Sequence, residues 1–184
     1  LGRPYFQRIV FPSKKYDIDI LINNKATARM RSMNLKHIVE AISKVAPHRR
    51  IFAFEYQSDG QKFDNVTFLD AKTSRQYVDF LLSAKDVITI DSAPAHIREG
   101  CRLPALALYF SFDSESRTKY YKYIQSVNLP AVCELQPCFL HGINPEDHCI
   151  MATDEELYAP CADRLFKDVV NYLAEMVNKY FKNT

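Results

Sequence analysis

The stretch that decides the fold reads Val87-Ile88-Thr89-Ile90, followed directly by Asp91-Ser92-Ala93-Pro94-Ala95-His96. Four consecutive β-branched residues predict a buried strand, and the six residues after them predict a turn that leads into a helix. Pro94 suits the first turn of a helix, where its missing N–H leaves no hydrogen bond unmade. Because ligands bind at the carboxyl ends of the strands in open α/β sheets, we expect a site at this turn.

The side chains of this turn have two interpretations. Asp91 or Ser92 can cap the helix, and the amides at a helix N-terminus favour anionic groups such as a diphosphate. The same residue types are equally typical of an ordinary helix cap that binds nothing. The residues around the turn are needed to distinguish an anion-binding turn from an ordinary helix cap.

Strand-like and helical patterns alternate outward from this turn, which predicts an α/β fold with a parallel sheet covered on both faces. Strands are expected over residues 17–23, 50–55, 66–69, 87–90 and 105–110, with an edge strand over 131–133. Helices are expected over residues 34–45, 75–84, 114–126 and 163–182. The last of these is long and amphipathic.

Length and composition limit the class of protein. A chain of 184 residues is one ordinary domain or one half of a two-domain enzyme, and 47% hydrophobic residues are enough for a sizeable core. The net charge of +2 does not indicate a broad nucleic-acid footprint. No apolar run approaches the roughly 20 residues that span a bilayer, and no secretory signal is visible.

The run from residue 65 to 109 resembles the donor-binding half of glycosyltransferase family nine, the ADP-heptose:lipopolysaccharide heptosyltransferases. The family pattern is "L.G.(T/S)", then "L..L...A", then "D.V(V/I)T.DSGP.H", a small-residue helix, "G.P" and an apolar strand. The matching segments here follow in the same order and spacing: Asn65–Ser74, Tyr77–Ala84, Asp86–His96, Gly100, Leu103-Pro104 and Ala105–Phe110. The agreement in order and spacing makes this far more specific than one short motif.

The resemblance implies a Rossmann-like parallel sheet flanked by helices, the C-terminal half of a GT-B glycosyltransferase. Residues 16–184 would form the nucleotide-sugar-binding domain, and residues 1–15 a linker from a missing N-terminal half. The chain begins at Leu1 rather than Met, so we expect a fragment. The implied reaction is inverting, metal-independent transfer of a sugar, ADP-heptose-like, to a hydroxyl of a bacterial glycolipid. The implied location is cytoplasmic, at most peripheral to the inner membrane, with the catalytic base on the missing half.

The resemblance also assigns roles within the central motif. Asp91 would lie close to the sugar and phosphates of the donor. Ser92 and the amides of Ala93 and Ala95 would cradle phosphate, and His96 would contact phosphate or sugar. Ala93 stands where the family has Gly, which strains the chain only if that position needs a positive φ.

Two further regions carry candidate donor-binding residues. The loop after the first strand lacks both the G-x-G-x-x-G motif and the P-loop motif. Its composition favours a basic loop that is simply exposed to solvent. The family pattern "(T/S)...K.WP" instead places Arg31 and Thr27 near the donor phosphates. Met33 and Asn34 stand where that pattern has Trp and Pro. Glu55, at the end of the second strand, would accept a hydrogen bond from the ribose or is a plain exposed strand end.

Four of the five cysteines gather in the last third of the chain: Cys133, Cys138, Cys149 and Cys161. Four thiolates select zinc or iron, and many family-nine enzymes have a similar segment before the last helix. The spacing is not that of a zinc ribbon. A structural metal site, free thiols and, least favoured in a reducing cytosol, disulfides are the alternatives.

Three departures from the family pattern motivate a second class of function. They are Ala93, Met33 and the loop Phe110-Ser111-Phe112-Asp113, which lacks the Gly and Thr of the family's "FG.T". In that alternative the chain is a degenerate, non-catalytic domain that binds a nucleotide sugar or serves as a scaffold. Retained nucleotide affinity would discriminate between a working donor site and a scaffold. A flavin or NAD enzyme is disfavoured because the Gly-rich turn is missing.

Overall fold

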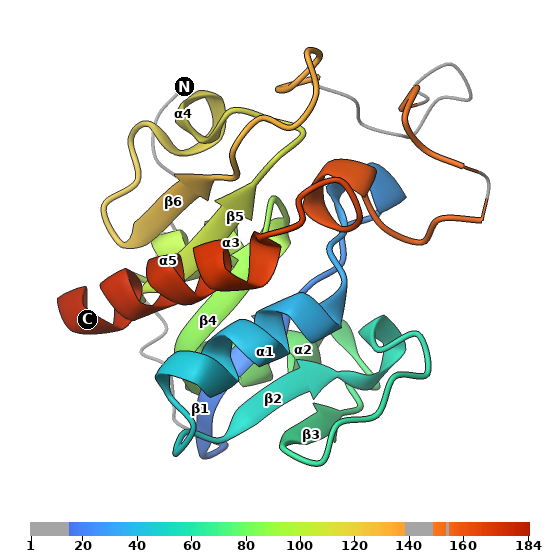
Figure 1. Ribbon diagram of the computed structural model, residues 1–184. Coiled ribbons are helices and arrows are strands. Elements are labelled where there is room, and N and C mark those ends of the chain that lie inside the picture. Colours follow the sequence, from blue (N-terminus) through green and yellow to red (C-terminus); the bar gives the residue numbers. More distant parts are fainter. Residues whose placement is uncertain (1–14, 139–148, 154) are drawn as a thin grey trace.

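A six-stranded parallel sheet forms the centre of the computed structural model (Figure 1), which describes residues 15–138, 149–153 and 155–184. The strands are β1 (Ile18–Asn23), β2 (Ile51–Phe54), β3 (Val66–Leu69), β4 (Ala84–Ile90), β5 (Ala105–Tyr109) and β6 (Ile124–Asn128). Their order is β3-β2-β1-β4-β5-β6, and every neighbouring pair is parallel. This is the Rossmann arrangement, so the expected α/β class is confirmed.

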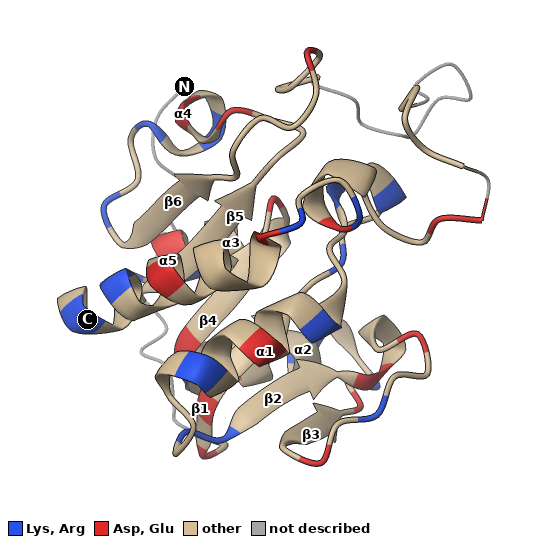
Figure 2. Ribbon diagram, viewed as in Figure 1, with Lys and Arg blue, Asp and Glu red and all other residues tan. Residues whose placement is uncertain are grey.

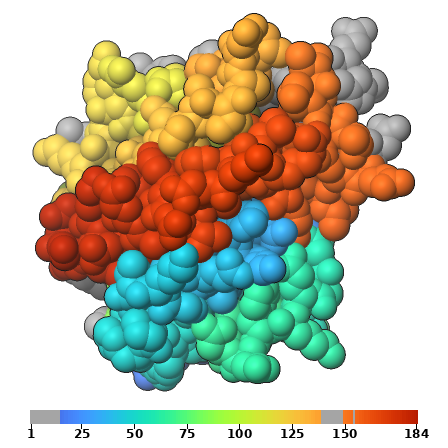
Figure 3. Space-filling model, viewed as in Figure 1, coloured from blue at the N-terminus to red at the C-terminus, as the bar shows by residue number. Residues whose placement is uncertain are grey.

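Helices cover both faces of the sheet. The helices α1 (Leu35–Val45) and α5 (Val169–Asn183) pack together on one face, where α5 runs across the front in Figures 1 and 3. The helices α2 (Ser74–Ser83) and α3 (Ala93–Gly100) cover the other face, and the short α4 (Ser114–Thr118) follows β5. Each face therefore has its own apolar core, and the strands between them are buried on both sides.

The side chains of β1 illustrate how one strand serves both cores. Ile20 and Ile22 pack on the side of α1 and α5, whereas Ile18 and Leu21 pack on the side of α2 and α3. All four are at most 2% exposed. Burying one such side chain contributes about 1.5–3 kcal/mol, so apolar side chains on both of its faces hold this strand at the centre of the sheet.

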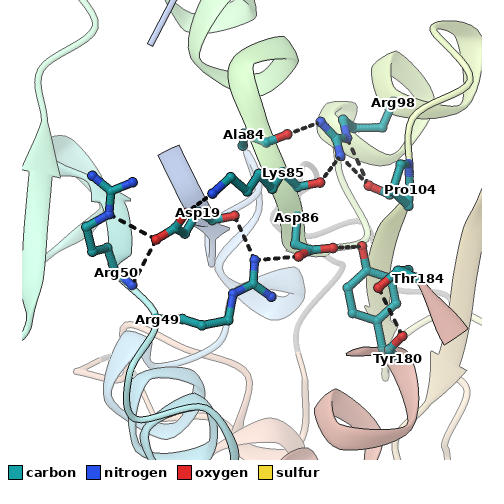
Figure 4. Close-up of polar contacts among 10 residues, drawn as sticks. All are labelled: Asp19, Arg49, Arg50, Ala84, Lys85, Asp86, Arg98, Pro104, Tyr180 and Thr184. Atoms are coloured by element: carbon teal, nitrogen blue, oxygen red, sulfur yellow. Dashed lines mark hydrogen bonds and ion pairs between the residues drawn. The ribbon is translucent and has the colours of Figure 1, made fainter. Parts of the chain in front are cut away.

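The amino ends of the central strands carry a network of charged side chains (Figure 4). The Asp19 carboxylate accepts from Arg50 Nε at 2.9 Å and from Lys85 Nζ at 2.6 Å. The hydrogen bond from Arg50 is the main reason that the pKa of Asp19 lies well below its usual value. Asp86 accepts from Arg49 Nη2 at 2.6 Å and from the Tyr180 hydroxyl at 2.8 Å, which ties α5 to β4.

Arg98 anchors α3 to the strands beside it. Its side chain is fully buried and donates to the carbonyl oxygens of Leu81, Ala84, Lys85 and Pro104 over 2.5–3.0 Å. Figure 4 shows the bonds to Ala84, Lys85 and Pro104. Burial lowers the pKa of Arg98 to about 10, so the guanidinium stays charged at neutral pH. The helix that carries the central motif is thus fixed at its far end by an array of charge-assisted hydrogen bonds.

The expected helix over residues 114–126 and the edge strand over 131–133 are wrong. The helix α4 ends at Thr118, and the edge strand is β6, which pairs with β5 along its whole length, from Ala105–Ile124 to Tyr109–Asn128. The exposed backbone of β5 needs hydrogen-bond partners, and pairing with a strand supplies more of them than a short helix can. Tertiary pairing therefore outweighs local helical propensity in this segment.

The last helix begins at Val169, six residues later than the expected start at residue 163. The chain before it makes the short 3-10 helix η3 (Pro160–Ala162) and a turn in which the Leu165 amide donates to the Pro160 carbonyl oxygen at 2.9 Å. The 3.6-residue pattern of apolar side chains continues through this turn, because Phe166 packs against the same core as α5. Periodicity alone does not show where such a helix starts.

Charged residues of both signs are interspersed along α1 and α5 in Figure 2. Two of these pairs lie one turn apart, Lys36 with Glu40 at 3.8 Å and Lys179 with Glu175 at 2.6 Å. Within the described ranges no helix combines the length and the apolar character that a bilayer crossing requires.

Candidate donor-binding site

The strand order reverses between β1 and β4, and the carboxyl ends of these two strands meet there. Asn23, the last residue of β1, pairs in register with Thr89 of β4, two residues before Asp91. Ligands of open α/β sheets bind in the crevice at such a switch point. A cavity of about 390 Å³ opens there, lined by Asn23, Lys25, Ala26, Thr27, Tyr56, Gln57, Tyr77, Ser92, Ala93 and Pro94.

Asn23 connects the loops around this cavity. Its Nδ2 donates to Ser92 Oγ at 2.9 Å and to the Lys25 carbonyl oxygen at 3.1 Å. Its Oδ1 accepts from Gln57 Nε2 at 2.8 Å and from the Tyr77 hydroxyl at 3.1 Å. The side chain is 1% exposed, so one buried amide holds together the segments after β1, β2 and β4 and helix α2.

Ser92 lies at the N-cap position of α3, but no side-chain hydrogen bond caps the helix. Its hydroxyl instead contacts Asn23 and lies 3.0 Å from Thr89 Oγ1. The Ala95 amide donates to the Ser92 carbonyl oxygen at 3.2 Å, and Ala95 is fully buried. Ala93, by contrast, is exposed and lines the cavity, so of these small residues it is the one placed to meet a ligand.

The substitution of Ala93 for the family glycine causes no backbone strain. Ala93 is the first residue of α3, and the non-glycine residues with positive φ in the described part of the chain are Asp59 and Arg102. The position therefore does not need glycine in this chain.

Asn34 stands where the family has proline, and its side chain caps α1 by accepting a hydrogen bond from the Lys36 amide at 3.1 Å.

Arg31 and Asp91 form a largely buried ion pair beside the cavity. Arg31 Nη1 lies 3.6 Å from Asp91 Oδ2, with 15% and 8% of the two side chains exposed. Both have a buried polar atom without a hydrogen-bond partner among the described residues, Arg31 Nε and Asp91 Oδ2. Each of the two side chains therefore has an atom that can form one more hydrogen bond. Buried polar atoms of this kind are rare in proteins, so they are candidates for contact with a ligand.

The other residues of this loop divide into two groups. Lys25 and Thr27 line the cavity, and Lys25 forms an ion pair with Asp59. Arg29 points away from the cavity, because its Nη1 donates to the carbonyl oxygens of Thr153 and Glu156 at 3.2 Å. The loop therefore places Lys25 in the cavity lining and Arg31 against Asp91, whereas Arg29 is held elsewhere.

The segment after β2 presents Tyr56 and Gln57 to the cavity rather than Glu55. The short helix η2 (Glu55–Gln57) begins directly after the strand, and Glu55 is exposed and does not line the cavity. Tyr77 of α2 completes this side, and burial holds its pKa above the usual value. Two phenol rings and an amide therefore form one end of the cavity, and a role for Glu55 stays a prediction.

His96 lies in the first turns of α3, on the flank of the motif nearest β5 and α4. Its Nδ1 is 2.5 Å from the Tyr121 hydroxyl. Burial is the main reason that the pKa of His96 lies below its usual value; Asp91 opposes this effect and Arg117 adds to it. His96 is therefore neutral at pH 7 and close to two charged side chains.

The structure brings Cys133, Cys138 and Cys149 within electrostatic reach of the Cys161 thiol. Burial, and then the other three thiols, raise the pKa of Cys161 to about 12. None of the cysteines forms a disulfide. Within residues 15–138, 149–153 and 155–184, however, no set of three His, Cys, Asp or Glu side chains forms a group that could hold a metal ion. The donor chemistry suits zinc or iron, but the described placement does not form a closed site.

Sequence reasoning missed the side chains that organise the cavity, namely Asn23, Gln57 and Tyr77. Asn23 carries the one usable signal, because a polar residue ends an apolar strand at the switch point. No such signal marks Tyr77, which lies in the middle of a helix, 54 residues from its partner Asn23. Of the predicted residues, Thr27, Ser92 and Ala93 line the cavity. Asp91 precedes Ser92 in the chain and connects the other two, because it pairs with Arg31 and acts electrostatically on His96.

Comparison with known proteins agrees with this architecture. No protein-family model matches the chain, and no curated protein matches it in sequence. Among solved structures it is similar to the bacterial iron-containing dodecameric glycosyltransferase TibC from enterotoxigenic E. coli, at 15% identity and a TM-score of 0.61, covering 100% of this chain and 50% of that one. It is also similar to TibC in complex with ADP-D-β-D-heptose, at 15% identity and a TM-score of 0.62, covering 95% and 48%.

A third similar structure is the E. coli heptosyltransferase WaaC with ADP-2-deoxy-2-fluoro heptose. The identity is 17% and the TM-score 0.51, over 66% of this chain and 39% of that one. This chain thus spans about half the length of TibC and less of WaaC. At these identities the likeness shows the fold alone: this chain and the two glycosyltransferases share a Rossmann-like fold.

Proposed function

We propose that this chain is the donor-binding domain of a glycosyltransferase and binds a nucleoside diphosphate sugar at the carboxyl edge of its sheet. The observation that carries the proposal is a cavity at the strand-order switch that is lined by Lys25 and by the start of α3. The ion pair of Arg31 with Asp91, the residue before Ser92 of that lining, lies next to it. The glycosyltransferase fold of its structural neighbours supports it, as does the ADP-heptose bound to one of them. ADP-heptose is accordingly the first donor to test.

Each part of the donor has a chemical counterpart in the cavity or in the ion pair beside it. Arg31 and Lys25 are the cations that suit diphosphate oxygens, and the exposed Ala93 at the start of α3 adds the positive end of a helix. The Tyr56 and Tyr77 rings suit the flat face of a nucleobase. Asp91, which accepts hydrogen bonds but does not donate them when ionised, suits sugar hydroxyls rather than phosphate.

In transfer, this chain would hold the donor and stabilise the diphosphate as it leaves. The same cations that bind the diphosphate neutralise the charge that develops on it. The acceptor hydroxyl, on a glycan or glycolipid, also needs a base, which we place on a second domain that residues 1–15 would join to this one. We therefore expect this chain alone to bind donor without turning it over. We place it in the cytoplasm, at most in peripheral contact with the inner membrane.

Calorimetric titration of the full chain with ADP, GDP, UDP and ADP-heptose tests the proposal. One nucleotide should bind selectively. Arg31→Gln should weaken it about tenfold or more, since a charge-assisted contact is worth about 1.5–3 kcal/mol. Asp91→Asn should instead remove mainly the added affinity of ADP-heptose over ADP. Asp64→Ala, at an exposed aspartate outside the cavity, is the matched control.

The same titration separates the two classes of function. If a folded sample binds none of the four ligands, the donor-domain proposal is contradicted and the scaffold alternative gains support. Turnover of ADP-heptose by this chain alone would contradict the placement of the base on another domain.

We further propose that Cys133, Cys138, Cys149 and Cys161 hold a structural zinc or iron ion. The support is the donor chemistry of four cysteines, three of which act electrostatically on the fourth, Cys161, and the description of TibC as iron-containing. Two histidines that the sequence places between these cysteines, His141 and His148, lie outside the described residues. Metal analysis of the purified chain should find about one equivalent, lost in the Cys138→Ser variant and kept in Cys101→Ser. A wild-type protein free of metal after expression in metal-supplemented medium would contradict this proposal.

A further inference from the structure

The contact between His96 and Tyr121 connects the motif helix to the segment after α4. His96 Nδ1 lies 2.5 Å from the Tyr121 hydroxyl, and the two rings meet edge to face with centroids 5.8 Å apart. Tyr121 is not part of the cavity lining and has no role in the site described above. The contact can therefore affect the protonation of the His96 imidazole without being part of the cavity.

The backbone around Tyr121 is held by the same helix that carries His96. Both carboxylate oxygens of Glu99, three residues further along α3, accept from the Lys122 amide at 3.0 and 3.1 Å. Glu99 Oε2 also accepts from the Tyr123 amide at 2.9 Å, and the Tyr121 amide donates to the Thr118 carbonyl oxygen at 2.8 Å. The phenol is thereby fixed relative to His96 rather than resting against it by chance.

The direction of this hydrogen bond decides which imidazole nitrogen carries the proton. Burial keeps the pKa of His96 below and that of Tyr121 above the usual values, so both groups are neutral at pH 7. A phenol hydroxyl is a better donor than acceptor, whereas an unprotonated imidazole nitrogen is a good acceptor. The arrangement thus favours donation by Tyr121 to Nδ1, which leaves the proton on Nε2.

We infer that Tyr121 is a positioning residue that fixes His96 as the tautomer with its proton on Nε2. His96 then presents a neutral N–H donor to the oxygens of a nucleoside diphosphate sugar. The identity of that ligand rests on the proposed function, whereas the tautomer and its cause do not.

The side chains around His96 are consistent with a ligand on this flank. Asp91 from the end of β4 and Arg117 from α4 are the charged groups that act on the imidazole, and the Arg117 guanidinium lies 4.2 Å from the centroid of the Phe112 ring. Tyr109, at the end of β5, is within electrostatic reach of Asp91, Arg117 and Tyr121.

Three buried polar atoms on this flank have no hydrogen-bond partner among the described residues. They are Asp91 Oδ2, the Tyr109 hydroxyl and Arg117 Nε. Asp91 Oδ2 is in the ion pair with Arg31 but accepts no hydrogen bond. Buried polar groups are nearly always hydrogen-bonded, so the three atoms leave hydrogen-bonding capacity for a ligand on this flank. A neutral donor such as His96 Nε2–H can join them without adding charge between Asp91 and Arg117.

Nuclear magnetic resonance of the full chain tests the tautomer directly. Long-range ¹H–¹⁵N spectra should show His96 Nδ1 unprotonated and Nε2 protonated, with the signals assigned by their loss in His96→Gln. In Tyr121→Phe, the measured pKa of His96 should rise by about half a pH unit or more, because the hydrogen bond that stabilised the neutral ring is gone. Tyr120→Phe, at the exposed neighbouring tyrosine, should leave it unchanged.

Two results would overturn the inference. One is a protonated Nδ1 in the wild type. The other is a His96 pKa that falls or stays constant in Tyr121→Phe, because a ring that donates to the phenol loses a stabiliser of its charged form when the hydroxyl is removed.

Affinity for ADP-heptose supplies a second readout. A glutamine side chain can place an N–H near the Nε2 position and an asparagine side chain near the Nδ1 position. His96→Gln should therefore retain several-fold more affinity than His96→Asn, and the reverse order would contradict a donor role for Nε2. If the wild type binds no nucleotide, the proposed function fails while the resonance experiment still decides the role of Tyr121.

Discussion

Replacing Asn23 with alanine tests the architecture of the site most severely. The substitution removes the donor to Ser92 Oγ and to the Lys25 carbonyl oxygen, and the acceptor for Gln57 Nε2 and the Tyr77 hydroxyl. Each such hydrogen bond contributes about 0.5–1.5 kcal/mol net. Ser92 keeps contacts with Thr89 and the Ile90 carbonyl oxygen, and Gln57 keeps its bond to Tyr56. We therefore expect a loss of about 2–4 kcal/mol in the free energy of unfolding.

Urea unfolding followed by circular dichroism measures this loss. The midpoint should fall while the slope of the transition stays constant, because the variant loses contacts without changing the surface exposed on unfolding. The affinity for ADP should fall about tenfold in parallel, since three loops around the cavity lose their common partner. Asn65→Ala is the matched control: Asn65 is exposed, makes one side-chain bond to Ser43 Oγ at 2.9 Å, and should change stability by about 0.5 kcal/mol or less.

A variant with unchanged midpoint and unchanged ADP affinity would refute the reasoning. It would mean that the loops hold their positions without the Asn23 amide. A loss of stability with full ADP affinity would separate the two roles and leave Asn23 as a structural residue only.

Three further predictions concern the rest of the fold. Arg98→Met should lower the free energy of unfolding by about 3 kcal/mol or more in urea, because it leaves buried carbonyl oxygens without their donor; a loss under about 1 kcal/mol would contradict this. Asp19→Asn should lower the free energy of unfolding most above about pH 4, because the folded pKa of Asp19 lies below its unfolded value. The difference from the wild type should shrink as the pH falls further, and a difference that grows in acid would contradict this. Asn34→Ala should cost about 1 kcal/mol in thermal or chemical unfolding through loss of the α1 cap, and an unchanged midpoint would count against the cap.

The central part of the fold follows from local sequence patterns. β3 spans Val66–Leu69 as expected, β1 and β5 are one residue shorter at one end, and β2 is one residue shorter at each end. β4 begins at Ala84, three residues before the expected start. The strands are recognisable because a sheet buried on both faces needs continuous apolar runs. The Asp91–His96 turn is recognisable because its polar residues follow such a run directly.

The last third of the chain follows local patterns less well. Ile124–Asn128 became the edge strand because β5 offers an unpaired backbone, and neither periodicity nor composition reports that. The cavity shows the same limitation, because Asn23, Gln57 and Tyr77 gain their meaning from hydrogen bonds that span 34 and 54 residues of sequence. Conformation over short distances is encoded locally, whereas buried polar networks depend on the completed sheet.

The location of nucleotide binding is the central claim, and a titration of the ¹⁵N-labelled chain with ADP tests it most directly. We predict that the amide resonances of Lys25, Gln57 and Ala93, which line the cavity, shift in a saturable manner. The amides of Asp19 and Lys85, at the amino edge of the sheet (Figure 4), should stay in place. Saturable shifts at the amino edge, or none anywhere at millimolar ADP, would contradict the account.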